Sequence, residues 1–172
     1  MGLCGNCRYI TGCKKKRDGV ESCIHYSPFK IPAVEIPTAT RTSIDEYYLG
    51  IARAVSRRST CLRRQYGAVI VKNDEIIATG YNGPPRGEEH CQKCSRTGHE
   101  HGDGNYDGCN SVHAEMNAII SAARRDMIGS TLYLAGFDNG EEIIAEPCPV
   151  CWRMIKNAGI KKVKMKSAQE KR

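Results

Sequence analysis

The sequence of 172 residues contains no apolar run that approaches the roughly 20 residues needed to cross a bilayer. Its first residues, Met1–Cys7, also lack the order of a basic stretch followed by an apolar one that marks a secretory signal. These absences argue against a membrane protein and against export, so we expect a soluble, cytoplasmic protein. The apolar fraction of 40% is enough for the core of one ordinary domain with a small appendage.

Ten cysteines in a chain without an export signal predict metal ligands before they predict disulfides. Two sets of four would each fill a tetrahedral zinc site, and a final pair would need one histidine to complete a third site. In chain order the groups are Cys4, Cys7, Cys13 and Cys23, then Cys61, Cys91, Cys94 and Cys109, then Cys148 and Cys151.

The formal net charge of +7 suits an anionic partner, such as a phosphorylated small molecule or nucleic acid. That value counts every cysteine as neutral. Ten thiolates on three zinc ions would remove ten charges and add six, which leaves a net charge of about +3. The basic balance is then mild and does not by itself predict binding of nucleic acid.

Composition divides the chain into three parts. Residues 1–30 are poor in apolar residues and rich in Cys, Gly and Lys, so they cannot bury a core unaided, and we interpret them as a zinc-binding segment. Residues 31–42 contain two prolines and are typical of an extended linker. Residues 43–172 are predicted to form the catalytic domain, which begins at a helix capped by Ser43 with Glu46 as its capping-box partner.

Hydrophobic periodicity in the last part predicts a mixed α/β fold. Its order of strand, strand, helix, strand, helix, strand is typical of a three-layer α/β/α sandwich with crossover helices. The segment 82–111 is long and polar, which is unusual in a compact domain unless something such as a metal pins it. Helices are predicted over 43–58, 112–125 and 148–158, and strands over 66–71, 75–81, 131–134 and 160–165.

Two short motifs, His-x-Glu and Pro-Cys-x-x-Cys, each begin a predicted helix. Cys148 and Cys151 are three residues apart, so on a helix they share one face and can hold one metal ion. His113 would complete three protein ligands and leave the fourth position for water, as in catalytic rather than structural zinc sites. Glu115 would then take a proton from that water, pass it to a ring nitrogen, and deliver another to a departing amine.

Each motif alone has another interpretation. A lone His-x-Glu is common in proteins, and a lone Cys-x-x-Cys on a helix also fits a structural zinc site or a redox pair. Together, in this order and each following a strand, they match the H-x-E…P-C-x-x-C signature of the zinc nucleobase deaminases. The pair of motifs therefore predicts a zinc-dependent deaminase.

Around these motifs the sequence resembles the deoxycytidylate deaminase family of the cytidine deaminase superfamily, over about residues 43–166. This resemblance implies that Asn82 hydrogen-bonds a sugar hydroxyl, that the Ala114 backbone meets the base carbonyl, and that Arg86 lies near the phosphate. Arg86 is equally well explained as a solvated loop residue, and Asn82 also suits a tight loop. The matching stretches are 64–71, 79–87, 112–119, 147–151 and 157–160.

Family resemblance also implies a structural zinc that pins the loop before the second helix. Cys61 and Cys91 match positions that usually contribute ligands, and Cys94 and Cys109 are the expected remaining ligands. Three histidines are rivals for these places, namely His90, His99 and His101. Some family members are hexamers regulated by deoxynucleoside triphosphates, so we expect a homo-oligomer and leave regulation by such effectors open.

The N-terminal cysteine group lies outside the resemblance. Its spacing suits a small zinc-binding knot formed by Cys4, Cys7, Cys13 and Cys23, with His25 as a spare ligand. We favour a structural or interaction module here over a nucleic-acid contact, and we favour zinc over an iron–sulfur cluster.

Three departures from the family pattern bear on the substrate. Residues 135–146 form a longer insert beside the expected base pocket, which we interpret as a hairpin turning at 138–140. The chain ends soon after the fourth predicted strand, which would leave an open sheet edge for an oligomer to cover. The Glu-Pro-Cys sequence at 146–148 resembles the tRNA adenosine and guanine deaminases more than the usual Ser-Pro-Cys.

From these residues we predict hydrolytic deamination of deoxycytidine monophosphate (dCMP) to deoxyuridine monophosphate (dUMP) and ammonia, with one catalytic and two structural zinc ions. One alternative is a deaminase acting on another nucleobase, in tRNA adenosine, guanine or cytidine. Another is a non-catalytic zinc protein that binds nucleic acid through its N-terminal segment. The presence of Glu115 argues against that last alternative, because a purely structural zinc has no use for the carboxylate. We expect a nucleotide as the partner, with no membrane.

Overall fold

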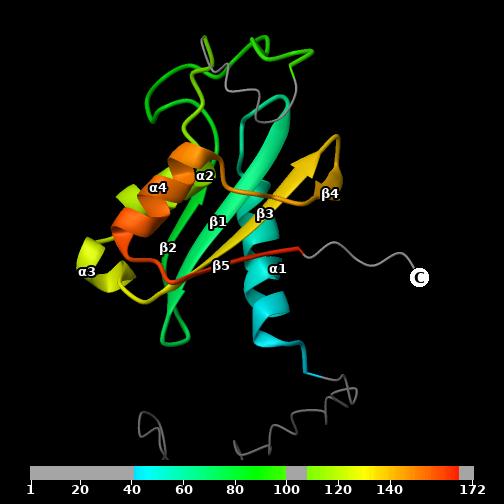
Figure 1. The fold of residues 1–172 in the computed structure, drawn as a ribbon. Helices are drawn as coiled ribbons and strands as arrows, with labels where there is room; N and C mark the ends of the chain where they lie inside the picture. The colour runs from blue at the N-terminus through cyan, green and yellow to red at the C-terminus, as the bar shows by residue number, and fades with distance from the viewer. Residues whose placement is uncertain (1–40, 100–107, 167–172) are drawn as a thin grey trace, which may run out of the picture. The chain divides into compact units, whose positions relative to one another are not determined.

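The computed structural model describes residues 41–99 and 108–166. The predicted zinc-binding segment 1–30 lies outside these ranges, as does most of the linker 31–42. The helices are α1 (Ile44–Ser56), α2 (Ala114–Ile120), α3 (Arg124–Met127) and α4 (Pro149–Ala158). The strands are β1 (Arg64–Lys72), β2 (Glu75–Tyr81), β3 (Thr131–Asp138), β4 (Glu141–Ile143) and β5 (Lys162–Met165) (Figure 1).

The five strands form one sheet with β1 and β3 at its centre. β1 pairs antiparallel with β2 on one side and with β3 on the other. On its far side β3 pairs twice: its first half runs parallel to β5, and its second half runs antiparallel to β4. The mixed α/β fold is thus confirmed. Within the described ranges β5 pairs only with β3, so the open edge expected from the sequence is present there.

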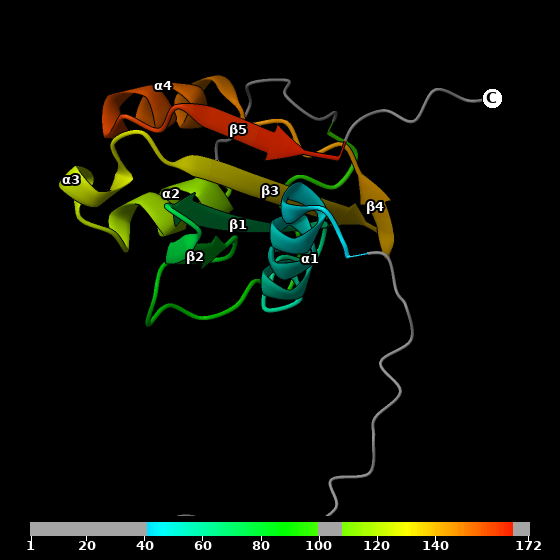
Figure 2. The ribbon, with the colours of Figure 1, turned by 90° about the horizontal axis from the view of Figure 1, so that it is seen from below.

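Helices cover both faces of this sheet, as Figure 2 shows. Alternate residues of a strand point to opposite faces, so β1 and β3 each serve two cores. Val69, Val71 and Tyr133 pack with α1, whereas Ile70 and Leu132 pack with residues of α2 and α4. Each of these side chains is buried, and burial of one such side chain stabilises the fold by about 1.5–3 kcal/mol.

Two hairpins close on turns in which both central residues have positive φ. Asn73 and Asp74, between β1 and β2, have φ of 51° and 65°. Asn139 and Gly140, between β3 and β4, have φ of 50° and 83°. Positive φ at both positions is the requirement of a type I′ turn, which matches the twist of the paired strands. The predicted hairpin in the insert is confirmed, and β3 continues through Asp138 rather than ending at residue 134.

The predicted helix over 112–125 is wrong in its extent. Helix α2 ends at Ile120, Ala123 has extended backbone (φ −73°, ψ 137°), and the separate short helix α3 follows. The break redirects the chain so that Met127 is buried in the core beneath α4. A continuous apolar stripe on one helix cannot reveal such a break, because the core contact of Met127 comes from distant parts of the chain.

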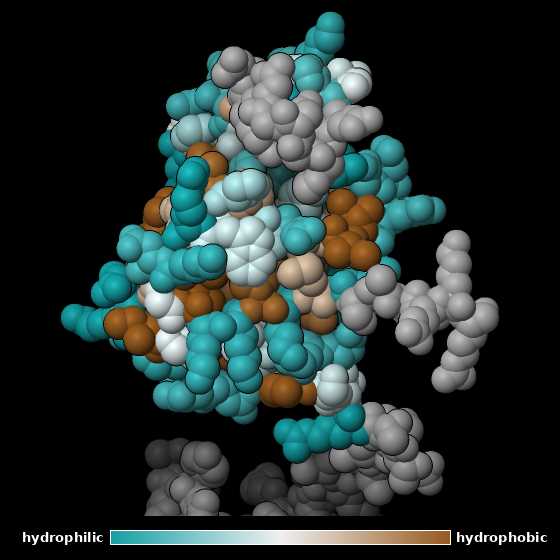
Figure 3. Space-filling view, viewed as in Figure 1, coloured by the Kyte–Doolittle hydropathy of each residue, from teal (hydrophilic) through white to brown (hydrophobic). Residues whose placement is uncertain are grey.

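On the face seen in Figure 3, hydrophilic residues cover most of the surface and hydrophobic ones gather in small groups. Among residues 41–99 and 108–166, no helix has both the length and the apolar character to cross a membrane.

Candidate active site

The two predicted motifs lie at the N-termini of α2 and α4, which pack against each other on one face of the sheet (Figure 1). His113 is the N-cap residue of α2, and Cys148 is the N-cap residue of α4. The Cys148 sulfur accepts a hydrogen bond from the Cys151 backbone N–H at 3.5 Å, and Pro149 occupies the first turn, where its missing N–H costs nothing. Local sequence therefore sets the residue at which each helix begins, and the packing of α2 against α4 brings the two N-termini together.

Contacts with β2 fix α2 in position. Gly83 and Val112 pair as an isolated bridge, which holds the chain immediately before His113. A Cβ atom at Gly80 would lie 2.3 Å from both the Ala114 carbonyl oxygen and the Ala118 nitrogen. Only glycine allows this close approach of helix to strand.

His113, Cys148 and Cys151 present their ligand atoms within 4.8 Å of one another, and no other cluster of three or more such groups occurs in the part of the chain that is described. The His113 Nδ1 atom lies 3.6 Å from the Cys148 sulfur and 3.4 Å from the Cys151 sulfur. Tetrahedral zinc with bonds of about 2.3 Å to sulfur and about 2.0–2.1 Å to nitrogen separates those atoms by about 3.5–3.6 Å. The side chains therefore fit a zinc ion, with Nδ1 as the imidazole ligand.

Glu115 lies in the first turn of α2 and is 5% exposed. Burial raises the pKa of this carboxyl, and contact with Cys151 opposes the rise. Burial also raises the pKa of the Cys151 thiol, with the Glu115 and Cys148 charges adding to the effect. A divalent cation held between the two sulfurs acts in the opposite direction and favours the thiolates.

One cavity contains most of this site. Its lining includes His113, Ala114, Glu115 and Cys148. Residues from β1, from the segment between α1 and β1, and from the loops that precede α2 and α4 complete it. These are Cys61, Arg63, Arg64, Tyr66, Asn82, Cys94, Arg96, Cys109, Ser111 and Glu146. Three arginines in the lining favour an anionic ligand.

The family model for the cytidine and deoxycytidylate deaminase zinc-binding region matches residues 42–167. The chain belongs to this family. It is 41% identical over 130 residues to the deoxycytidylate deaminase of Mycobacterium phage D29, an alignment that covers 72% of this chain and 94% of the relative. It is 35% identical over 130 residues to the deoxycytidylate deaminase of Schizosaccharomyces pombe, and there the alignment covers 74% of this chain but only 38% of the relative.

A solved structure gives the same result for the fold of this deaminase. The dCMP deaminase of cyanophage S-TIM5, in complex with dCMP and dUMP, superposes with a TM-score of 0.53 at 31% sequence identity. The match covers 72% of this chain and 81% of that one. The zinc-binding region named by the family model contains the cluster of His113, Cys148 and Cys151.

Asn82 is buried and its side chain ties β1 to β2 in the deaminase fold. Its Oδ1 atom accepts hydrogen bonds of 2.7 Å from the Tyr66 backbone N–H and from the Ser59 hydroxyl. Its Nδ2 atom donates to the Arg64 carbonyl oxygen at 2.9 Å. An amide nitrogen carries two protons, so one remains for a ligand in the cavity that Asn82 lines.

The other predicted ligand-contact residues differ in placement. Ala114 is fully buried and lines the cavity. Arg86 is exposed on its loop and is not among the residues that line the cavity.

The four predicted ligands of the middle structural zinc are partly brought together. Cys61, Cys94 and Cys109 line one cavity, but Cys91 does not, and in the described ranges they form no cluster of three ligand atoms within 4.8 Å. This zinc site stays a prediction. Of the rival histidines, His101 lies outside the described residues. So do the N-terminal ligands Cys4, Cys7, Cys13 and Cys23.

Sequence reasoning missed several members of the cavity lining. Arg64 and Tyr66 lie at the start of β1 and Arg63 immediately precedes it. The available signal was the pair of arginines that leads into this strand. Arg96 is 6% exposed, and its place within a polar loop gave no sign of burial.

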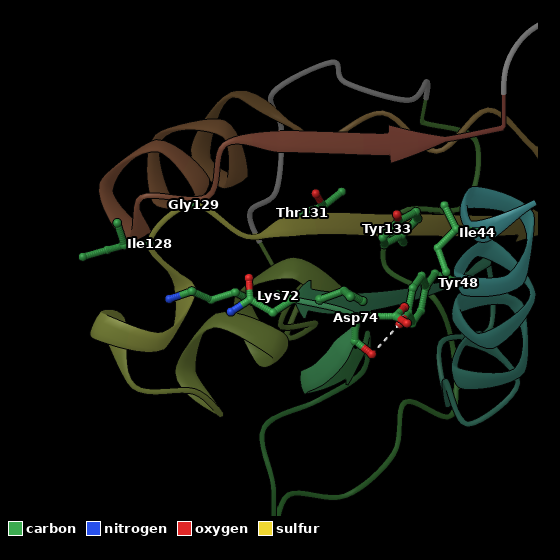
Figure 4. Close-up of a pocket in the computed structure, with 10 residues that line it drawn as sticks. Ile44, Tyr48, Lys72, Asp74, Ile128, Gly129, Thr131 and Tyr133 are labelled. Carbon is green, nitrogen blue, oxygen red and sulfur yellow. Dashed lines mark hydrogen bonds between the residues drawn. The ribbon is translucent and has the colours of Figure 1, made fainter.

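A second cavity lies on the α1 side of the sheet (Figure 4). Tyr48 and Tyr133 line it, and the Tyr48 hydroxyl donates to the Asp74 carboxylate at 2.7 Å. Hydrogen bonding to Asp74 raises the pKa of Tyr48 to about 12. None of the predicted site residues lines this cavity.

Proposed function

We propose that the chain is a zinc-dependent hydrolase that converts dCMP and water to dUMP and ammonia. The observation that carries the proposal is the cluster of one imidazole and two sulfurs, beside a buried carboxylate, in one cavity. Support for the substrate comes from the deoxycytidylate deaminase of phage D29, because the match covers nearly all of that protein.

The Nδ1 atom of His113 and the sulfurs of Cys148 and Cys151 would hold the zinc ion. When bound, zinc supplies a nucleophilic water at neutral pH, since it lowers the pKa of water to about 7. Both sulfurs lie at the N-terminus of α4, whose partial positive charge stabilises thiolates.

Glu115 would move protons between the water and the substrate. Its carboxylate accepts a proton as the water oxygen bonds to C4 of the cytosine ring, and it passes that proton to ring nitrogen N3. It then transfers the second water proton to the amino group as the C4–N bond breaks and ammonia leaves. Burial suits this role, because a carboxyl in a dry site does not exchange its proton with bulk water.

Groups around the zinc ligands would hold the nucleotide. The second amide proton of Asn82 would donate a hydrogen bond to a sugar hydroxyl. The Ala114 N–H would donate to the base carbonyl, because backbone N–H groups in the first helical turn have no partner within the helix. The arginines of the lining suit the phosphate. Arg86 is an additional phosphate contact in this proposal, made from its exposed loop.

Ammonia release from a nucleotide panel tests the proposal. We expect activity on dCMP, and Glu115→Gln should keep its zinc while its kcat falls by about 10²–10⁴-fold, the usual contribution of general acid–base catalysis. Glu75→Gln is the matched control, since Glu75 is exposed on β2 away from the cavity. Activity on adenosine in tRNA with none on cytidine nucleotides would contradict the substrate. Salt-dependent nucleic-acid binding without any turnover would contradict the enzyme.

Four further expectations are part of the proposal: a structural zinc on Cys61, Cys91, Cys94 and Cys109, a zinc-binding segment at 1–30 joined by a linker to the domain, a homo-oligomer, and a cytoplasmic location. Elemental analysis of the full chain should find about three zinc ions per protein, and a value of one would contradict both structural sites. Light scattering measures the oligomeric state, with added deoxynucleoside triphosphates as the test for effectors.

A further inference from the structure

The hydroxyl of Tyr66 is buried in the wall of the active-site cavity, and it makes no hydrogen bond to any described residue. Buried hydroxyls normally find a partner, and those left without one are costly. The buried tyrosines of α1 and β3 follow this rule: the Tyr48 hydroxyl donates to Asp74 and the Tyr133 hydroxyl donates to Asp45. The Tyr66 hydroxyl is therefore a buried hydroxyl without a partner among the described residues, in the cavity that contains the candidate zinc ligands.

The ring that carries this hydroxyl is held tightly. Tyr66 lies opposite Gly136 in the ladder between β1 and β3. A Cβ atom at Gly136 would lie 2.6 Å from Cε1 and 2.7 Å from Cδ1 of the ring, so the ring occupies the space that a side chain would take. The same Cβ would lie 3.2 Å from the Ala145 side chain. The insert of residues 135–146 thus supplies the surface against which the ring packs.

The Arg64 side chain interacts electrostatically with the hydroxyl, but no hydrogen bond of normal geometry joins the two. Its Nε atom donates to the Asp138 carboxylate at 2.7 Å, which directs the guanidinium toward the β3–β4 hairpin. Burial raises the pKa of Tyr66, and the polar interaction with the Arg64 side chain, followed by its charge, opposes the rise. The hydroxyl therefore keeps its proton at neutral pH and is available as a donor.

We propose that Tyr66 is a substrate-binding residue whose hydroxyl donates a hydrogen bond to an oxygen atom of the nucleotide in the active-site cavity. The inference rests on the proposed function, because the ligand is taken to be a nucleotide. A hydroxyl already desolvated and fixed by packing gives up little hydration or freedom when it meets an acceptor. One such hydrogen bond between neutral groups is worth about 3–10-fold in affinity, and more if the acceptor is charged.

The test is Tyr66→Phe, which keeps the packing of the ring on Gly136 and removes only the oxygen. We expect the variant to keep its zinc content and to bind dUMP about 3–10-fold more weakly, with the KM for dCMP rising similarly. Its melting temperature without nucleotide should equal or exceed that of the wild type, because an unpaired buried hydroxyl has been removed. If the Tyr66 hydroxyl had only a structural role, Tyr66→Phe would lower the melting temperature and leave the affinity for dUMP unchanged.

Tyr48→Phe is the matched control, since its hydroxyl is paired with Asp74 on the opposite face of the sheet. This control should lower the melting temperature and leave the affinity for dUMP unchanged. Comparing dUMP with deoxyuridine identifies the acceptor. A loss confined to dUMP places it on the phosphate, and an equal loss for both ligands places it on the base or sugar.

If Tyr66→Phe binds both ligands as tightly as the wild type, this inference is overturned while the proposed function stands. A lowered melting temperature together with unchanged affinity would overturn it too, because the hydroxyl would then have a partner within the protein, such as Arg64. If the wild type itself neither binds dUMP nor deaminates dCMP, both the inference and the proposed function are overturned.

Discussion

Replacing Gly80 by alanine should damage the active site although Gly80 is not one of the zinc ligands. The added Cβ would lie 2.3 Å from the Ala114 oxygen and the Ala118 nitrogen, whereas ordinary contacts of a Cβ begin near 3.4 Å. Both atoms belong to the backbone of α2, so no side-chain rotation relieves the clash. The helix must retreat by about 1 Å, and it carries His113 and Glu115 at its N-terminus.

Overpacking of this kind costs about 1–3 kcal/mol, which corresponds to a fall in melting temperature of about 4–12 °C for a domain of this size. A shift of about 1 Å in a catalytic group costs about 10²-fold in rate. We therefore expect Gly80→Ala to lose both stability and kcat/KM for dCMP. Circular dichroism melts and ammonia release measure the two effects.

Gly50→Ala is the control for the replacement of a glycine by alanine. Gly50 is exposed within α1, and a Cβ there would have no atom within 4 Å. Alanine in an exposed helix interior is favoured over glycine by about 1 kcal/mol, so this variant should be slightly more stable and equally active. Wild-type stability and activity in Gly80→Ala would refute the reasoning, because α2 would then not be held against β2 as described.

Three further predictions concern the stability of the domain and its dependence on zinc. Asn82→Ala should lower the free energy of unfolding by about 1–3 kcal/mol in urea denaturation, because it leaves the Tyr66 N–H without its acceptor; an unchanged denaturation midpoint would contradict this. The Lys164 ammonium donates to the Asp45 carboxylate at 2.8 Å, and this hydrogen bond lowers the pKa of Asp45. The ion pair therefore stabilises the fold fully above the ordinary carboxyl pKa of about 4, and this stabilisation is lost as the pH falls through the lowered pKa. Asp45→Asn should therefore melt below the wild type at pH 7, and melts down to pH 3 should show the gap closing; a gap that is constant with pH would count against the ion pair. Removal of zinc by a chelator should lower the melting temperature, and added zinc should restore it, whereas a melt indifferent to chelation would argue against a bound metal.

The candidate zinc site was partly predictable from sequence, because each half of it has local geometry while His113 and Cys148 are 35 residues apart. Cys148 and Cys151 are about one helical turn apart, and the N-cap residues of α2 and α4 are His113 and Cys148. Four of the strands and the hairpin in the insert followed from alternation and from turn residues such as Asn139, whose φ is positive in the structure. What the sequence could not fix was how far each element extends, as the break after Ile120 shows.

The residues missed by sequence reasoning act across the sheet rather than along the chain. Tyr66 is fixed by Gly136, which is 70 positions away in sequence, and Gly80 is required by the backbone of a helix that begins at Ala114. No periodicity or motif encodes these pairs. Asn82 was predicted as a ligand-contact residue, but its bonds to β1 give it a structural role that spacing did not indicate.

The account is tested most directly by a crystal structure with anomalous diffraction measured at the zinc absorption edge. We predict an anomalous peak about 2.0–2.1 Å from His113 Nδ1 and about 2.3 Å from the sulfurs of Cys148 and Cys151, with a non-protein oxygen as the fourth ligand. A fourth ligand from the protein, or no peak among these three side chains, would contradict the assignment of a catalytic zinc.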